Sequence, residues 1–321
     1  MSLAELIGQP VALRILEAAL QGGKISSAYL FYGPPGVGKR FAAMGFAQLL
    51  LCQSPRGLRP CGDCPACRLL QAGTHPDLLV LEPSGGMLRV DEVRALQEAL
   101  ALKPLQGRRK VALLKEAHTM NPQAANAFLK TLEEPPGEST LILCTPRAAE
   151  LPATIRSRCT PVPFRPLREQ HTMALLEERY QGPELRLLAR LCMGRPGLAL
   201  RENPLLARQK ALQALGSMGQ PGKAPWADHQ ELQEFLDILG LLLRDALVLK
   251  LTSEQALLIN QDLAGPLAKM AKRATEKGII ECYQRISALK AELVFNLNRN
   301  ILFNYIGSLL REFELEVSAC N

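Results

Sequence analysis

The chain has 321 residues, too many for one core of ordinary size, so we expect two or three domains. Hydrophobic residues make up 47% and charged residues 21%, which excludes a wholly disordered or fibrous protein. No apolar run approaches the roughly 20 residues that cross a bilayer. Glu5 also interrupts the opening segment, where a secretory signal would be basic and then apolar. We therefore expect a cytoplasmic protein without a membrane segment. The net charge of +7 permits contact with nucleic acid but does not establish it.

The first half of the chain alternates helix-like and strand-like patterns. Helices are predicted over residues 11–21, 39–51 and 91–102, and strands over 28–32, 77–81, 110–114 and 140–144. Because the strands are apolar throughout and separated by helices, they indicate a parallel sheet covered on both faces. Strand signals stop after Pro166, so residues 1–166 are predicted to form one α/β domain.

The second half of the chain shows only helical patterns. Short helices are predicted over 167–201, followed by a polar connector over 216–227 and long helices over 228–251 and 278–316. These patterns predict a small helical domain of residues 167–207 and a larger all-α domain of residues 208–321. Apolar stripes on the long helices are more often core than interface. They comprise Leu232, Phe235, Leu236, Leu239 and Leu243, and Leu293, Leu297, Ile301, Tyr305 and Leu309. Trp226, the single tryptophan, is predicted to be a packing residue.

A glycine-rich loop between a predicted strand and a predicted helix resembles a phosphate-binding loop. In such a loop, backbone N–H groups and a helix N-terminus hold phosphates, and a lysine neutralises them. The candidate nucleotide-binding residues are Gly33, Pro34, Gly36, Gly38, Lys39 and Arg40. The sequence therefore predicts a P-loop α/β domain.

Two positions that should hold magnesium carry cations instead. Arg40 stands where a Ser or Thr hydroxyl would bind Mg²⁺, and Lys115 stands where an aspartate would end the next motif strand. We therefore expect the Mg²⁺ site to be lost and ATP or ADP binding to be weak or absent. Two alternatives stay open: Lys39, Arg40 and Lys115 hold a polyphosphate without a metal, or the loop is a structural relic.

Four of the nine cysteines are crowded into residues 52–67. Cys52, Cys61, Cys64 and Cys67 have the short spacers that let thiolates converge on one tetrahedral ion, and four soft ligands favour structural Zn²⁺. An iron–sulfur cluster is the chemical competitor. No open coordination position would remain for catalysis.

Several motifs resemble bacterial DNA polymerase III clamp-loader subunits of the AAA+ family, most closely the delta-prime type. The resemblance covers essentially the whole length and rests on residues 6–9, 28–31, 74–77, 124–136 and 151–159, together with the four-cysteine insert. It implies an AAA+ domain with a zinc module, then a helical lid domain and a helical collar that mediates oligomerisation. It also implies a heteropentamer with gamma/tau-like and delta-like subunits, which acts on the sliding clamp and on primer-template DNA.

The resemblance assigns a role to Arg158 in Ser157-Arg158-Cys159. In the family, this arginine acts in trans as an arginine finger on the nucleotide of a neighbouring subunit. The second sensor motif of the motor subunits ends in arginine, where this chain has Gly197. Glu116 and Thr145 occupy the places of the catalytic glutamate and the first sensor, and we expect them to serve in capping or hydrogen bonding.

Two other functions are open on sequence alone. A gamma/tau-like subunit that hydrolyses ATP would turn over MgATP at about one per second or faster, and Lys39→Ala would abolish that turnover. A free-standing zinc-containing repair factor would bind DNA tightly, without sequence preference and with a steep salt dependence. The leading prediction is a non-hydrolysing, delta-prime-type stator.

Overall fold

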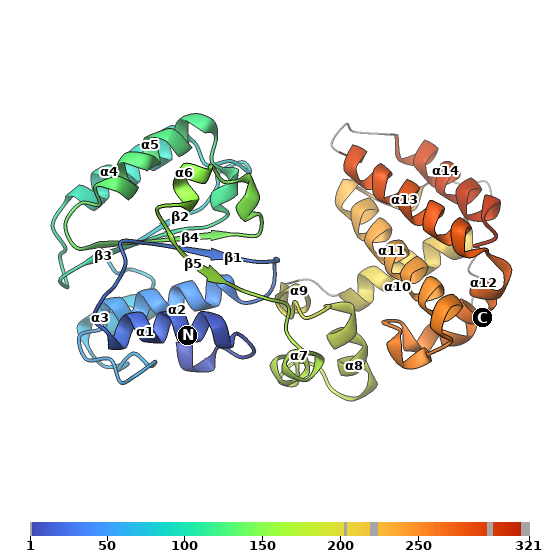
Figure 1. The fold of residues 1–321 in the computed structure, drawn as a ribbon, viewed down its shortest axis with the longest axis horizontal. Coiled ribbons are helices and arrows are strands. Elements are labelled where there is room, and N and C mark those ends of the chain that lie inside the picture. The colour runs from blue at the N-terminus through green and yellow to red at the C-terminus, as the bar shows by residue number, and fades with distance from the viewer. Residues whose placement is uncertain (1, 202–203, 219–223, 294–297, 316–321) are drawn as a thin grey trace. The chain divides into compact units, whose positions relative to one another are not determined.

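The computed structural model describes residues 2–201, 204–218, 224–293 and 298–315 (Figure 1). It divides into two compact units. The first comprises residues 1–175 with 193–197, and the second comprises residues 176–192 with 198–321. The domain boundaries expected after residues 166 and 207 are finer than this division and stay predictions.

The first unit is built on a parallel five-stranded sheet. Its strands are β1 (Ala28–Tyr32), β2 (Leu78–Leu81), β3 (Lys110–Leu114), β4 (Ser139–Thr145) and β5 (Thr160–Pro163), in the order β2-β3-β4-β1-β5. Every neighbouring pair is parallel, so the carboxyl ends of all five strands lie on the same side of the sheet, where the strands end. The predicted α/β class is confirmed.

Helices cover both faces of this sheet (Figure 1). One face carries α1 (Pro10–Gln21), α2 (Lys39–Leu51) and α3 (Pro65–Gln71), and the other carries α4 (Val90–Ala101), α5 (Pro122–Glu133) and α6 (Ala153–Arg156). Each face has its own core: Phe31 and Phe46 belong to the first, and Phe128 and Leu141 to the second. Short 3₁₀ helices lie at Leu3–Glu5, Ala117–Thr119 and Ala148–Glu150, and α7 (Glu169–Leu176) follows the sheet.

The strand β5 corrects the sequence analysis, which placed the last strand of the sheet before Arg158. The segment is short and contains Pro161 and Pro163, which depress the strand signal. Proline is tolerated on an edge strand because one side of that strand needs no ladder hydrogen bonds. The strand β5 lies at the edge and pairs only with β1.

The second unit is helical, as predicted. It contains α8 (Gly182–Leu191), most of α9 (Gly197–Arg201), α10 (Pro204–Ser217), α11 (His229–Thr252), α12 (Ala264–Arg273), α13 (Glu276–Glu292) and α14 (Arg299–Glu312). Two 3₁₀ helices, Gln255–Leu257 and Gln261–Leu263, lie between α11 and α12. Its single core includes Phe235, Leu242 and Phe303. Within the described ranges, no helix combines the length and apolar character needed to cross a membrane.

Two details of the helical prediction were wrong. The region predicted as one helix over 278–316 contains two, α13 and α14, and neither α10 nor α12 was expected. The α11 stripe is buried throughout, whereas in the second stripe Ile301 is 67% and Tyr305 42% exposed. Leu297 lies outside the described residues.

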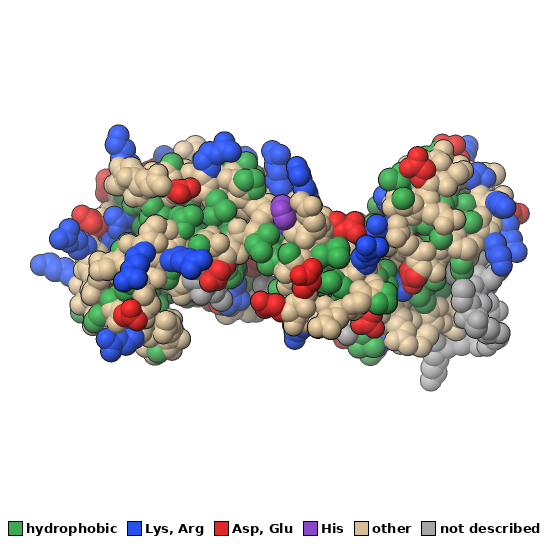
Figure 2. Space-filling view, turned by 90° about the horizontal axis from the view of Figure 1, so that it is seen from below, with side chains coloured by type: hydrophobic (Ala, Val, Ile, Leu, Met, Phe, Trp, Pro, Cys, Tyr) green, Lys and Arg blue, Asp and Glu red, His purple; other side chains and the backbone are tan. Residues whose placement is uncertain are grey.

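The positive charge does not form one patch on the face drawn in Figure 2. Lys and Arg side chains are spread over both units there, with acidic and apolar side chains between them. This distribution agrees with the modest basic excess of the sequence.

Candidate functional site

The glycine-rich loop leaves the carboxyl end of β1 and leads into α2, as a phosphate-binding loop does. Gly33 requires glycine: its φ is 142°, and a Cβ there would lie 2.1 Å from the backbone oxygen of Phe164. The loop therefore packs directly on the chain that follows β5. The predicted loop residues 33–40 come together as one turn at the carboxyl ends of the strands.

The lysine of the loop is already bound to the loop itself. Lys39 is only 8% exposed, and its Nζ donates to the backbone oxygens of Gly33 at 2.5 Å and Pro34 at 2.7 Å. Gln9 holds the same loop, because its Nε2 donates to the oxygens of Val37 at 3.2 Å and Arg165 at 2.7 Å. The loop is thus ordered by internal contacts.

The segment in the place of the second sensor presses on the loop through its backbone. Gly197 donates its N–H to the Gly36 oxygen at 2.9 Å. A Cβ on Gly197 would lie 2.9 Å from both the Cα and the oxygen of Gly36. No side chain fits between the two backbones without a shift.

A carboxylate that the sequence analysis missed lies between the two cations at the magnesium positions. Glu82 forms an ion pair with Lys115, and its Oε1 is 3.9 Å from Nη2 of Arg40. Glu82 directly follows β2, and Lys115 directly follows the neighbouring β3. Because carboxyl ends of adjacent parallel strands lie together, a correct strand order would have brought Glu82 to notice.

Four further side chains lie at the ends of β3 and β4. Glu116 has a left-handed backbone, with φ 48° and ψ 47°, and its side chain caps no helix, contrary to one expectation. His118 Nδ1 is 3.7 Å from the Glu116 carboxylate, but burial lowers the pKa of His118 overall. Thr145 makes a hydrogen bond, as expected, since its Oγ1 accepts from the Arg147 N–H at 3.1 Å. Burial raises the pKa of the adjacent Cys144 thiol to about 12, so this thiol stays protonated.

Arg158 lies between α6 and β5, and two contacts orient its guanidinium. Nη2 is 2.6 Å from Oε1 of Glu133, the last residue of α5, and Nη1 donates to the Thr154 oxygen at 2.9 Å. The Arg158 side chain is 36% exposed, so the guanidinium is positioned and still open to solvent. The Glu133 contact was not foreseen.

Arg158 and the glycine-rich loop lie at opposite ends of the strands: Arg158 lies at the amino ends, and the loop lies at the carboxyl ends. Thr160 pairs with Tyr29, and Pro163 pairs with Tyr32, which directly precedes the loop. Arg158 therefore precedes the amino end of β5, whereas the loop follows the carboxyl end of β1. The chain from Tyr29, which pairs with Thr160, to Gly33 covers about 13 Å along the strand direction. This topology directs Arg158 away from the loop of its own chain.

The four clustered cysteines converge as predicted. Their sulfurs lie within 4.8 Å of one another, with 3.8 Å between Cys61 and Cys67 and 3.6 Å between Cys67 and Cys52. A tetrahedral Zn²⁺ with Zn–S bonds of about 2.3 Å separates its sulfurs by about 3.8 Å. The set therefore fits one four-coordinate metal ion.

Backbone N–H groups support thiolate character within the cluster. The amides of Cys61, Cys64 and Cys67 donate to the sulfurs of Cys52, Cys61 and Cys64, at 3.2, 3.4 and 3.4 Å. Such donors lower the pKa of the Cys61 thiol to about 6, whereas burial raises that of Cys67 to about 12. A metal would overcome the second effect, because it binds the thiolate form.

Two family profiles match long stretches of this chain. A profile described as DNA polymerase III, delta subunit, matches residues 8–168, and one described as the C-terminal part of that subunit matches residues 205–310. The DNA polymerase III subunit delta' of Escherichia coli is 34% identical over 302 residues, 89% of either chain. This chain belongs to the delta-prime family. The corresponding subunit of Pseudomonas aeruginosa is 51% identical over 134 residues, 41% of either chain.

The delta' subunit of Escherichia coli matches more of the chain than the tau subunit of the same organism does. DNA polymerase III subunit tau of Escherichia coli is 35% identical over 226 residues, which cover 67% of this chain and 35% of the tau subunit. The match to E. coli delta' extends over most of both chains, so the delta-prime assignment accounts for the helical second half as well.

Proposed function

We propose that this chain is the delta-prime subunit of a DNA polymerase III clamp loader and assists ATP hydrolysis by a neighbouring subunit without hydrolysing ATP itself. The names of the relatives support membership in the complex. The observation that carries the proposal is the ion-pair cluster of Arg40, Lys115 and Glu82 beside the glycine-rich loop.

This cluster is unsuited to magnesium-dependent phosphoryl transfer. Magnesium in such sites needs a hydroxyl and a carboxylate that bridge it to the phosphates. Arg40 and Lys115 supply cations there, and the Glu82 carboxylate is engaged with both of them. An incoming phosphate would compete with Glu82 for these cations, so binding of ATP or ADP is weak or absent.

Arg158 is the residue through which the chain contributes to ATP hydrolysis. A guanidinium that is oriented by Glu133 and partly open to solvent suits stabilisation of charge on a γ-phosphate that another subunit holds. Its position at the opposite end of the strands from its own loop supports action in trans. The partners we propose are gamma/tau-like and delta-like subunits in a heteropentamer that loads the sliding clamp on primer-template DNA.

The cysteine cluster holds a structural Zn²⁺ in this proposal. Cys52, Cys61, Cys64 and Cys67 fill all four positions of a tetrahedral ion, which leaves none for a substrate or water. The metal therefore stabilises the segment between α2 and α3 and takes no part in the chemistry.

The role of Arg158 is tested in a reconstituted loader. Arg158→Ala should reduce single-turnover ATP hydrolysis at the adjoining site by about 10³-fold, the lower range measured for arginine fingers. Arg156→Ala is the matched control, since Arg156 is an exposed arginine two residues away on α6. Clamp-stimulated hydrolysis at the wild-type rate with Arg158→Ala would remove the trans-acting role. Hydrolysis by the isolated chain, abolished by Lys39→Ala, would instead identify a motor subunit.

A further inference from the structure

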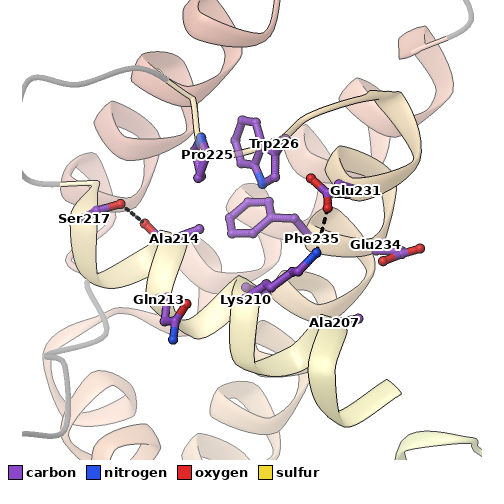
Figure 3. Close-up of a pocket in the computed structure, with 11 residues that line it drawn as sticks. Ala207, Lys210, Gln213, Ala214, Ser217, Pro225, Trp226, Glu231, Glu234 and Phe235 are labelled. Atoms are coloured by element: carbon purple, nitrogen blue, oxygen red, sulfur yellow. Dashed lines mark hydrogen bonds and ion pairs between the residues drawn. The ribbon is translucent and has the colours of Figure 1, made fainter. Parts of the chain in front are cut away.

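The helical unit contains a pocket of about 360 Å³ between α10 and the start of α11 (Figure 3). Its walls include Ala207, Ala214, Trp226 and Phe235, and its rim carries charged side chains. None of these residues belongs to the glycine-rich loop, the cysteine cluster or the surroundings of Arg158. The pocket is therefore a separate feature, and the inference from it is independent of the proposed function.

A buried donor without a partner lies in the wall of this pocket. Trp226 is only 7% exposed, and its ring packs against Phe235 and Phe303 at centroid distances of 4.9 and 5.6 Å. Its Nε1 has no hydrogen-bond partner among the described residues. The nitrogen lies at the edge of the ring that faces Phe235 and Lys210 (Figure 3). Since buried indole N–H groups normally find an acceptor, this donor points to one that is absent.

The rim of the pocket is acidic overall. Lys210 is neutralised by Glu231, whose Oε1 lies 2.7 Å from Nζ. Glu234 lies one turn further along α11 and adds a negative charge that Lys210 does not balance. A phosphate or carboxylate is disfavoured at such a rim, whereas a cationic side chain is attracted to it.

We propose that this pocket binds an extended peptide segment of a partner protein. The segment carries an apolar residue, preferably proline, that packs on the apolar wall formed by Ala207, Ala214 and the Trp226–Phe235 pair. A backbone carbonyl of the segment accepts a hydrogen bond from the indole N–H of Trp226. A Lys or Arg side chain close by in the segment pairs with Glu234. Aromatic-lined grooves bind proline-rich segments in this way, because the extended conformation is already formed and its carbonyls are unpaired.

Trp226 is the single tryptophan of the chain, so its indole N–H gives one NMR signal that reports on this pocket alone. The probe is the peptide acetyl-Arg-Pro-Leu-Pro-amide, titrated into the ¹⁵N-labelled full chain. We expect the indole proton to shift downfield in a saturable manner, with a dissociation constant in the millimolar range. The same peptide with Glu in place of Arg should bind several times more weakly.

Two variants and one control complete the test. Ala207→Leu fills the pocket and should weaken binding at least tenfold. Glu234→Gln removes the rim charge and should weaken it about two- to fivefold, the range for an exposed ion pair. Glu184→Gln, an exposed site on α8 outside the pocket, should leave binding unchanged. Thermal unfolding shows whether Ala207→Leu is folded; if it is not, Glu234→Gln decides.

Three results would overturn the proposal. One is an indole signal that does not move up to 20-fold above the expected dissociation constant. The second is equal binding of the Arg and Glu peptides, or an affinity that Glu234→Gln leaves unchanged. The third is an indole proton already shifted downfield in the free chain and insensitive to peptide, which would show that the chain or water supplies the acceptor.

Discussion

Glu82 changes how the cations around the glycine-rich loop can act on a phosphate. Arg40 and Lys115 on their own would present two positive charges to a phosphate, and the sequence suggested such a role. Their shared carboxylate offsets part of that charge and occupies their donors. We therefore expect the loop to attract a polyphosphate less strongly than the two cations alone would.

Removal of the Glu82 charge should restore part of that attraction. In Glu82→Gln we expect inorganic triphosphate to bind about three- to tenfold more tightly without magnesium, a modest gain because solvent screens the half-exposed carboxylate. Isothermal titration calorimetry measures this change. Glu98→Gln, an exposed site on α4, is the control and should bind triphosphate like the wild type. Equal affinity in Glu82→Gln and wild type would show that Glu82 does not compete with phosphate.

Local motifs were predictable at this scale, and distant pairs were not. The loop residues and the four cysteines were found because a tight turn and a metal site each impose short, fixed spacings. Glu82 is 33 residues from Lys115 and 42 from Arg40 along the chain, and Glu133 is 25 from Arg158. No spacing rule relates such residues until the strand order is known.

At the scale of secondary-structure elements, the cysteine cluster at the ends of α2 and α3 supports a prediction that chelation tests. Arg56 lies in the exposed loop between Cys52 and Cys61 and is a cleavage site for trypsin, whereas the bond after Arg59 precedes Pro60 and resists trypsin. We expect a chelator, or Cys64→Ser, to remove about one zinc per chain and to speed cleavage after Arg56 at least tenfold, because a structural metal contributes folding free energy.

Elemental analysis and mass spectrometry of the fragments provide the measurements. Cys282→Ala, a buried cysteine of α13 outside the cluster, should keep its metal and its resistance to trypsin. Iron in place of zinc would identify an iron–sulfur cluster, and unchanged cleavage after metal loss would show that the metal does not hold this loop.

Elements with a clear apolar pattern were predicted well, and others, α10 and α12 among them, were missed. The ranges expected for β1, α2 and β3 agree with the structure to the residue. Two prolines concealed β5, and α3 begins inside the cysteine cluster, whose spacing had been interpreted as a metal turn. The helical character of α14 was predicted, but the burial of its apolar stripe was not, because Ile301 and Tyr305 lie on an exposed face. Periodicity gives the phase of a helix, and tertiary packing decides which part of the stripe is covered.

The described residues form three hydrophobic cores, two of them in the first unit, and the histidines with shifted pKa values lie in that unit. His75 precedes β2 and accepts the Asp77 N–H on Nδ1 at 3.1 Å, while His118 follows β3. Burial lowers the pKa of both side chains below the ordinary value of 6.5, and nearby carboxylates offset part of this effect. Both histidines are therefore held neutral in the folded unit.

The sign of the pH dependence follows from these shifts. Below pH 6.5 the unfolded chain binds protons that the folded chain does not, so stability is full above that pH and falls as the pH decreases. Each histidine can contribute at most about 1.4 kcal/mol per pH unit over this interval. We expect the melting temperature of the first unit to fall between pH 7.5 and 5.5, as measured by calorimetry. The fall should be smaller in His75→Asn, which has an acceptor but no ionisable group. A melting temperature that is constant over this interval would contradict the prediction.

The backbone contact between Gly197 and Gly36 limits which residue position 197 can hold. A hydroxyl at position 40 and a carboxylate at position 115 would need only new side chains at half-exposed or strand-end sites. An arginine at position 197 would first have to displace the main chain of the glycine-rich loop, because even a methyl group collides there. If the chain descends from an active ATPase, this step would be hard to reverse. Once the two backbones were in contact, a single substitution could no longer restore an arginine at position 197.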